Sequence, residues 1–275
     1  FFFPYFSHPD PTVKRKSGFL TPVYSSSDNL GRAINVPYFL AISDAKDMTF
    51  NPRIYSDGDF ILQSEYRESF KNSNLIADFS FNQDEGNTNT HFFINADGNL
   101  NENTLYSLEF QNVTNDNYLA IHDFSGITET NALTARFNSS TLTSFFKIDK
   151  EIDSNTQFET SVRMYESLNV SNDHDKYQYI FPDFNFNKNI ELDESYNGQF
   201  SFTSSGYQKN HDTNIYEAQL NNDFNFASYS YFSDGGILTK YNLKLKNFNT
   251  YSENSSTFDE NSDHEIFTSL LINSE

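Results

Sequence analysis

The stretch DFILQSEYRESF, residues 59–70, alternates between apolar and polar side chains. In an extended chain successive side chains point to opposite faces, so this pattern predicts a β-strand with one apolar and one polar face. The apolar face carries Phe60, Leu62, Tyr66 and Phe70, and the polar face carries Gln63, Glu65 and Arg67.

The same alternation recurs along the chain, for example in NLIADFSFN (74–82) and LYSLEFQ (105–111). Clusters rich in Asn, Asp, Gly and Ser separate these runs, as in SDGD (56–59) and SDGG (233–236). Such clusters are typical of turns. The sequence therefore predicts an all-β chain with a dozen or more antiparallel strands of about 9–12 residues.

Composition narrows the class of protein. Among 275 residues, aromatic side chains make up 17% (30 Phe, 17 Tyr and no Trp), cysteine is absent and the formal net charge is -20. The acidic balance argues against a nucleic-acid partner, and the lack of cysteine excludes disulfides and thiolate metal sites. The first 71 residues hold as many basic as acidic side chains, so the acidic excess lies in the remainder.

Two architectures suit these strands. A soluble β-sandwich would bury the apolar face against a second sheet, whereas a transmembrane β-barrel would turn it towards lipid and the polar face towards a wet lumen. Strand length and the aromatic excess favour the barrel. In a barrel the lumen-facing polar side chains would include Glu65, Arg67 and Glu109.

The segment SGFLTPVYSSSDNLGRAINVPYFLAI, residues 17–42, looks like a β-hairpin with a proline in each strand, Pro22 and Pro37. Proline has no N–H for a sheet ladder, so both prolines weaken the hairpin. They would either lower the cost of separating these strands or only suppress edge pairing.

Catalytic chemistry has little support in the sequence. GxSxG, HExxH, phosphate-binding and dinucleotide-binding motifs are all missing, so we expect neither an enzyme nor a bound metal or cofactor. The longer connection NDNYLAIHDFSGITET, residues 115–130, is of the kind that folds over or into a pore.

Two blocks carry a family resemblance: PYFSHPDPTVKRKSGFLTP (4–22) and INVPYFLAISDAKDMTFNPRIYSDGDFILQSEYR (34–67). Together they resemble the barrel entry of the lipopolysaccharide-assembly family LptD (OstA). YIFPDFNF (179–186) resembles a later strand of that family, and from residue 187 onward only the alternation matches.

The resemblance implies a protein in two parts, a periplasmic β-jellyroll and an outer-membrane barrel of about 26 strands. Residues 1–13 would end the jellyroll, and residues 14–275 would form the N-terminal half of the barrel. Because half a barrel leaves two unpaired edges, we expect this chain to be a fragment. The implied partners are lipopolysaccharide, a lipoprotein plug resembling LptE, periplasmic bridge proteins acting through the jellyroll, and the barrel-assembly machinery.

By the same resemblance, the first strands form a lateral gate in the outer membrane of a Gram-negative bacterium. The gate residues would be Pro22, Pro37, Phe19 and Tyr38. Lys14, Arg15 and Lys16 would contact lipopolysaccharide phosphates at the junction between jellyroll and barrel, or form a solvated hinge. Two other functions stay open: a passive outer-membrane porin and a soluble β-sandwich adhesin.

Overall fold

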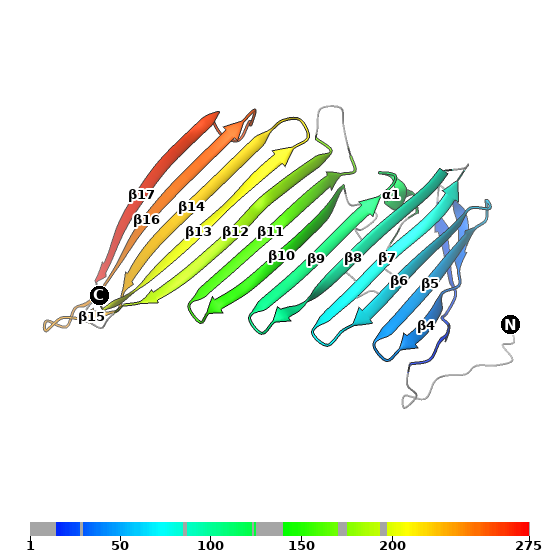
Figure 1. Ribbon diagram of the computed structural model, residues 1–275, viewed down its shortest axis with the longest axis horizontal. Coiled ribbons are helices and arrows are strands. Elements are labelled where there is room, and N and C mark those ends of the chain that lie inside the picture. Colours follow the sequence, from blue (N-terminus) through cyan, green and yellow to red (C-terminus); the bar gives the residue numbers. More distant parts are fainter. Residues whose placement is uncertain are drawn as a thin grey trace. The chain divides into compact units, whose positions relative to one another are not determined.

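The computed structural model describes residues 15–27, 30–84, 87–122, 124, 140–169, 175–192 and 197–274. Within them the chain forms seventeen β-strands and one short helix (Figure 1). The contacts divide it into two units: unit 1 comprises Phe1–Ala96 with Gln111–Asn138, and unit 2 comprises Asp97–Phe110 with Ser139–Glu275. The prediction of an all-β chain is confirmed, whereas the predicted domain boundary after residue 13 lies outside the described residues.

Unit 1 begins with four short strands and continues with longer ones. Its strands are β1 (Gly18–Phe19), β2 (Val23–Ser27), β3 (Gly31–Asn35), β4 (Tyr38–Ser43), β5 (Lys46–Tyr55), β6 (Phe60–Ser69) and β7 (Ser73–Asp84). It also holds the first part of β8 (Asn87–Asn101), the end of β9 (Thr104–Val113) and the helix α1 (Tyr118–His122). These strands pair antiparallel, as β1–β4, β2–β3, β3–β5, β4–β5, β5–β6 and β6–β7.

Unit 2 is a series of long antiparallel hairpins that lie side by side, coloured green to red in Figure 1. It holds the rest of β8 and β9, followed by β10 (Thr141–Asp153), β11 (Thr156–Ser167), β12 (Tyr177–Glu191), β13 (Gly198–His211), β14 (Tyr216–Ser228), β15 (Tyr231–Phe232), β16 (Leu238–Glu253) and β17 (Asn261–Ser274). Several strands exceed the predicted 9–12 residues because the ladder continues through polar residues at the strand ends. The sixteen residues of β16 are an example.

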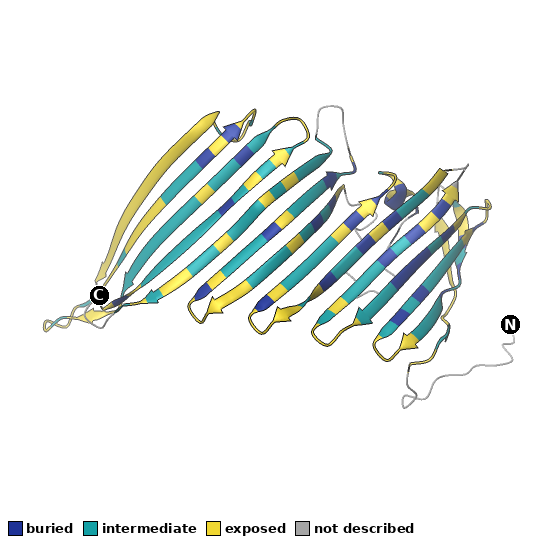
Figure 2. Ribbon diagram, viewed as in Figure 1, coloured by how far each residue is buried: buried dark blue, intermediate teal, exposed yellow. Residues whose placement is uncertain are grey.

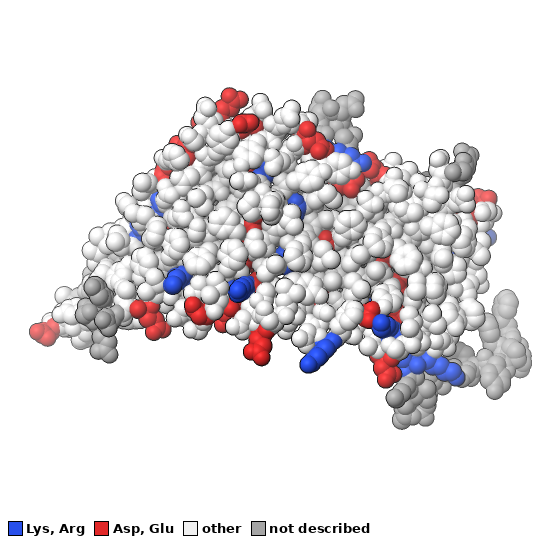
Figure 3. Space-filling model, in the orientation of Figure 1, with Lys and Arg blue, Asp and Glu red and all other residues white. Residues whose placement is uncertain are grey.

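The two faces of unit 2 differ in chemistry, as the alternation predicts. The face that we call the charged face carries the ion pairs Lys147–Glu159 at 2.7 Å, Arg163–Asp183 at 3.0 Å and Lys209–Glu217 at 2.7 Å. The opposite face, the aromatic face, carries ring contacts such as Phe202–Phe224, with centroids 4.7 Å apart. In the view of Figure 3, charged side chains gather mainly towards the ends of the strands.

The core of unit 1 lies on one face of β5–β8, against which α1 packs, and we call this the α1 face. Figure 2 shows buried residues along these strands. Ile61, Phe93 and Phe124 are fully buried, and Tyr118 and Leu119 of α1 are each 1% exposed. Within the described part of the chain, no helix has both the length and the apolar character needed to cross a membrane.

The first hairpin differs from the sequence prediction of two continuous strands. Each run is interrupted at its proline, so β1 and β2 are separated at residues 20–22, and β3 and β4 at residues 36–37. The missing N–H groups of Pro22 and Pro37 explain these interruptions, because a proline cannot donate to the ladder.

Candidate functional site

Strand register aligns polar side chains in rows across the α1 face. One row joins Asn51, Gln63 and Ser80 on β5, β6 and β7, and the next joins Thr49, Glu65 and Asp78. Gln63, Glu65, Asp78 and Ser80 are each 2% exposed or less. Buried polar groups need hydrogen-bond partners, so these rows require an organised network.

That network is centred on Asp78 and His91. The Gln63 amide donates to both Asp78 carboxylate oxygens, at 3.2 and 3.1 Å, and His91 Nε2 lies 3.0 Å from Asp78 Oδ1. The other ring nitrogen, Nδ1, lies 2.6 Å from Ser80 Oγ. Finally, the Tyr118 hydroxyl lies 3.0 Å from the same Ser80 oxygen, so the network connects α1 to the α1 face.

A cation and several rings complete the attachment of α1. Arg53 on β5 donates from Nη1 to the backbone carbonyl of His122 and lies 5.7 Å from the centre of the Phe124 ring. The Tyr118 ring packs on those of His122 and Phe124, with centroids 5.0 and 5.1 Å apart. Burial raises the pKa of Tyr118 to about 12, so its hydroxyl stays protonated at neutral pH.

That residues 115–130 fold over or into a pore stays a prediction, and the structure shows only where the described portion packs. Residues 115–122 and Phe124, which we call the α1 segment, pack on the α1 face. The remainder of that connection lies outside the described residues.

A second polar cluster lies further along the same face, near the N-terminal end of β5. The buried Asp47 carboxylate contacts Arg15 at 2.7 Å and Arg67 at 2.7 Å, and Arg67 lies 3.6 Å from Glu65. A pocket of about 180 Å³ is lined in part by Arg15, Asp47 and Arg67. Predicted lumen residues Glu65 and Arg67 thus share one face and one cluster.

The predicted basic cluster is only partly described. Arg15 is engaged with Asp47, and the Ser17 hydroxyl accepts a hydrogen bond from the Ala41 N–H at 3.0 Å. These contacts fix the segment before β1 to β4 and β5. Lys16 is exposed, and Lys14 lies outside the described residues.

The four predicted gate residues lie together in the first hairpin. Phe19 and Tyr38 are cross-strand partners whose rings meet edge to face, with centroids 5.1 Å apart. The Leu20 N–H donates to the Pro37 carbonyl at 2.8 Å, and Pro22 follows two residues after Leu20. Sequence reasoning missed a role for Pro52 on β5, whose carbonyl accepts from the Val36 N–H at 3.3 Å.

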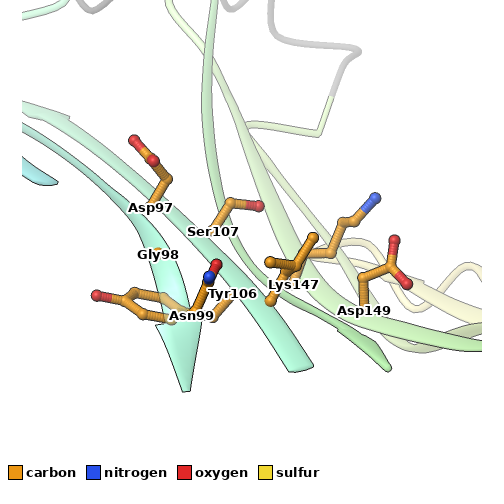
Figure 4. A pocket seen from close by; sticks show the side chains of 8 residues that line it. Asp97, Gly98, Asn99, Tyr106, Ser107, Lys147 and Asp149 are labelled. Atoms are coloured by element: carbon orange, nitrogen blue, oxygen red, sulfur yellow. The ribbon is translucent and has the colours of Figure 1, made fainter. Parts of the chain in front are cut away.

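The third predicted lumen residue, Glu109, belongs to unit 2. Glu109 on β9 pairs with Phe145 on β10. Two residues away on the same strands, Ser107 pairs with Lys147. A pocket of about 260 Å³ lies close by, and Figure 4 shows Asp97 on the opposite side of it from Asp149. Its lining is Asp97, Gly98, Asn99, Leu105, Tyr106, Ser107, Lys147 and Asp149.

Comparison with known proteins identifies the family. Residues 1–192 match the family model described as LptD protein. The chain belongs to the LptD family. This family match ends close to residue 187, from which we expected only the alternation to match, whereas the similarity to the first relative below covers 86% of the chain and so extends further.

Individual LptD relatives are similar over different lengths. The LPS-assembly protein LptD of Pseudoalteromonas translucida (strain TAC 125) is 25% identical over 249 residues, which cover 86% of this chain and 32% of the relative. That of Cupriavidus pinatubonensis (strain JMP 134 / LMG 1197) is 38% identical over 64 residues, 23% of this chain and 8% of the relative. The chain therefore spans a third or less of these LptD proteins.

Among solved structures, a bacterial polysaccharide outer membrane secretin covers 87% of this chain and 89% of its own, with 7% identity and a TM-score of 0.35. That score is too low to support an argument.

Three residues of the network on the α1 face escaped sequence reasoning: Arg53, Asp78 and His91. Asp78 and Ser80 are on the polar face of a strand that the alternation predicts, so the sequence indicated which face of the sheet they share. His91 and Arg53 had no such signal, because their roles depend on where the α1 segment docks.

Proposed function

We propose that the full-length protein containing this chain inserts lipopolysaccharide into the outer leaflet of the Gram-negative outer membrane. In this proposal the chain forms the first part of the outer-membrane barrel, and the protein acts as a transport component rather than an enzyme. The observation that carries the proposal is the LptD match over residues 1–192, which includes the strands β1 to β12.

The two faces of the sheet support a barrel. The charged face of unit 2 suits a hydrated lumen, and the aromatic face suits lipid. Phe146, Val162, Tyr241 and Leu243 on the aromatic face are all exposed. A sandwich adhesin would bury such side chains under a second sheet, so their exposure favours the barrel over the sandwich.

The first hairpin supports a lateral gate at the start of the barrel. In an extended strand the N–H and C=O of a residue point to the same side. Since the Pro37 carbonyl faces Leu20, the donor that Pro37 lacks would also face that strand. Each lost hydrogen bond lowers the cost of local strand separation by about 1 kcal/mol. Pro22, Pro37, Phe19 and Tyr38 are the proposed gate.

The polar clusters have proposed roles in the same pathway. Glu65, Arg67 and Glu109 would line the hydrated lumen. Arg15 and Lys16, with Lys14, would meet lipopolysaccharide phosphates at the entry to the barrel. Because Asp47 already holds Arg15, phosphate would have to compete with that carboxylate. The proposed protein partners are a lipoprotein plug resembling LptE, periplasmic bridge proteins and the barrel-assembly machinery.

The test is depletion of the full-length protein in its own bacterium, followed by measurement of newly made lipopolysaccharide at the cell surface. We expect the amount of newly made lipopolysaccharide at the surface to fall first, before any fall in the uptake of small solutes across the outer membrane. If solute uptake falls and lipopolysaccharide still reaches the surface, a passive porin is the better assignment.

A further inference from the structure

The network beneath Tyr118 has a defined hydrogen-bond direction. A carboxylate only accepts, so Asp78 fixes a proton on His91 Nε2, at 3.0 Å. In the neutral ring, His91 Nδ1 then accepts from the Ser80 hydroxyl, at 2.6 Å. The remaining capacity of the Ser80 oxygen is that of an acceptor, and the Tyr118 hydroxyl fills it from 3.0 Å. On the α1 face, Ser80 therefore offers an acceptor to a hydroxyl donor.

A second acceptor lies in the same row. The buried amide oxygen of Asn51 has no hydrogen-bond partner among the described residues. Asn51 and Ser80 flank Gln63 on neighbouring strands, so their positions are about 10 Å apart. Buried acceptors of this kind are rarely left empty, and a spacing of this size suits a ligand that offers hydroxyls at more than one point.

Aromatic surface lies beside these acceptors. The His91 ring packs on Phe93 and Phe124, with centroids 4.9 and 4.8 Å apart, and Phe93 is fully buried. An apolar ring beside directed polar groups is the usual composition of a site that orients a small ligand. Phe124 belongs to the α1 segment, whereas Phe93 belongs to β8 and would stay in place if that segment moved.

We propose that the wall formed by Asn51, Gln63, Asp78, Ser80 and His91 is a saccharide-binding site that the chain's own Tyr118 occupies. The ligand class is an uncharged, hydroxyl-rich part of a sugar chain, which displaces the Tyr118 hydroxyl from Ser80 and moves the α1 segment off the wall. This inference rests on the proposed function, because the sugar is that of the transported lipopolysaccharide.

The test measures whether sugar exposes the buried side of α1. The 275 residues contain no cysteine, so an introduced cysteine is the one reporter thiol among them. Any cysteine elsewhere in the full-length protein is replaced first. Leu119→Cys places the thiol on the buried side of α1, and Ala120→Cys places a control thiol on the exposed side of the same helix. The readout is the labelling rate with a water-soluble maleimide in detergent micelles.

Two changes should increase labelling at position 119. Tyr118→Phe removes one hydrogen bond, for which we expect about 5-fold faster labelling without sugar. The water-soluble core oligosaccharide, freed from lipopolysaccharide by mild acid, should accelerate labelling at least about 3-fold at millimolar concentration, by population shift. The rate at Ala120→Cys should change in neither case. Oligosaccharide without effect on Leu119→Cys, in a protein where Tyr118→Phe does accelerate labelling, would overturn the proposal.

A second measurement does not depend on the reporter. Calorimetric titration of the full-length protein with the same oligosaccharide should show binding that Asn51→Ala weakens about 5-fold or more. Asn189→Ala, which makes the same change at an exposed position of β12, should leave that binding intact. Equal affinities in all three proteins would contradict the site. Failure here is distinct from failure of the proposed function, which depletion tests separately.

Discussion

At the scale of single residues, Gly206 on the aromatic face has no room for a side chain. A Cβ atom there would lie 2.6 Å from the Gln219 carbonyl oxygen and 3.1 Å from the Phe184 ring. We expect Gly206→Ala to destabilise the full-length protein by about 1–3 kcal/mol, because the nearest atom is backbone and cannot move aside cheaply. The measurement is the temperature at which the protein loses its compact migration in a denaturing gel.

Gly235→Ala is the matched control for that prediction, since the nearest atom to its added Cβ is Ser233 Oγ at 3.7 Å, an ordinary contact. The control should keep the unfolding temperature of the unsubstituted protein. Equal temperatures for both variants would contradict the close approach of β13 and β14 at Gly206.

At the scale of elements, the first hairpin depends on which donors its prolines remove. Pro37→Ala restores an N–H on the side facing Leu20, so we expect the Leu20 amide and its neighbours to exchange hydrogen about 5-fold more slowly. Thr21→Ala, which changes an exposed neighbour without adding a donor, should leave that exchange unchanged. Faster or equal exchange in Pro37→Ala would show that the missing donor does not weaken this hairpin.

Alternation predicted the elements better than it predicted their contacts. The polar face of residues 59–70 was correctly predicted, and Gln63, Glu65 and Arg67 share the α1 face. The alternation of side chains between the two faces of a strand is a local property, so a single sequence contains it. The contact of Tyr118 with Ser80 spans 38 residues, and no local pattern encodes which strand a connection will meet.

At the scale of the whole molecule, LptD membership and the two-faced strands lead to one account. In unit 1 polar rows line the α1 face and proline interrupts the first hairpin, and in unit 2 aromatic rings cover the face opposite the ion pairs. A barrel that delivers a lipid sideways needs a hydrated interior and one weak position in its wall. Pro22 and Pro37 are the proposed weak position.

The most direct test is the double substitution Pro22→Ala and Pro37→Ala in the full-length protein, expressed in cells depleted of the unsubstituted form. The quantity to measure is the rate at which newly made lipopolysaccharide reaches the cell surface, at matched levels of folded protein. We expect a slower rate, because two restored donors raise the cost of opening the first strands. A rate equal to that of the unsubstituted protein would contradict the gate.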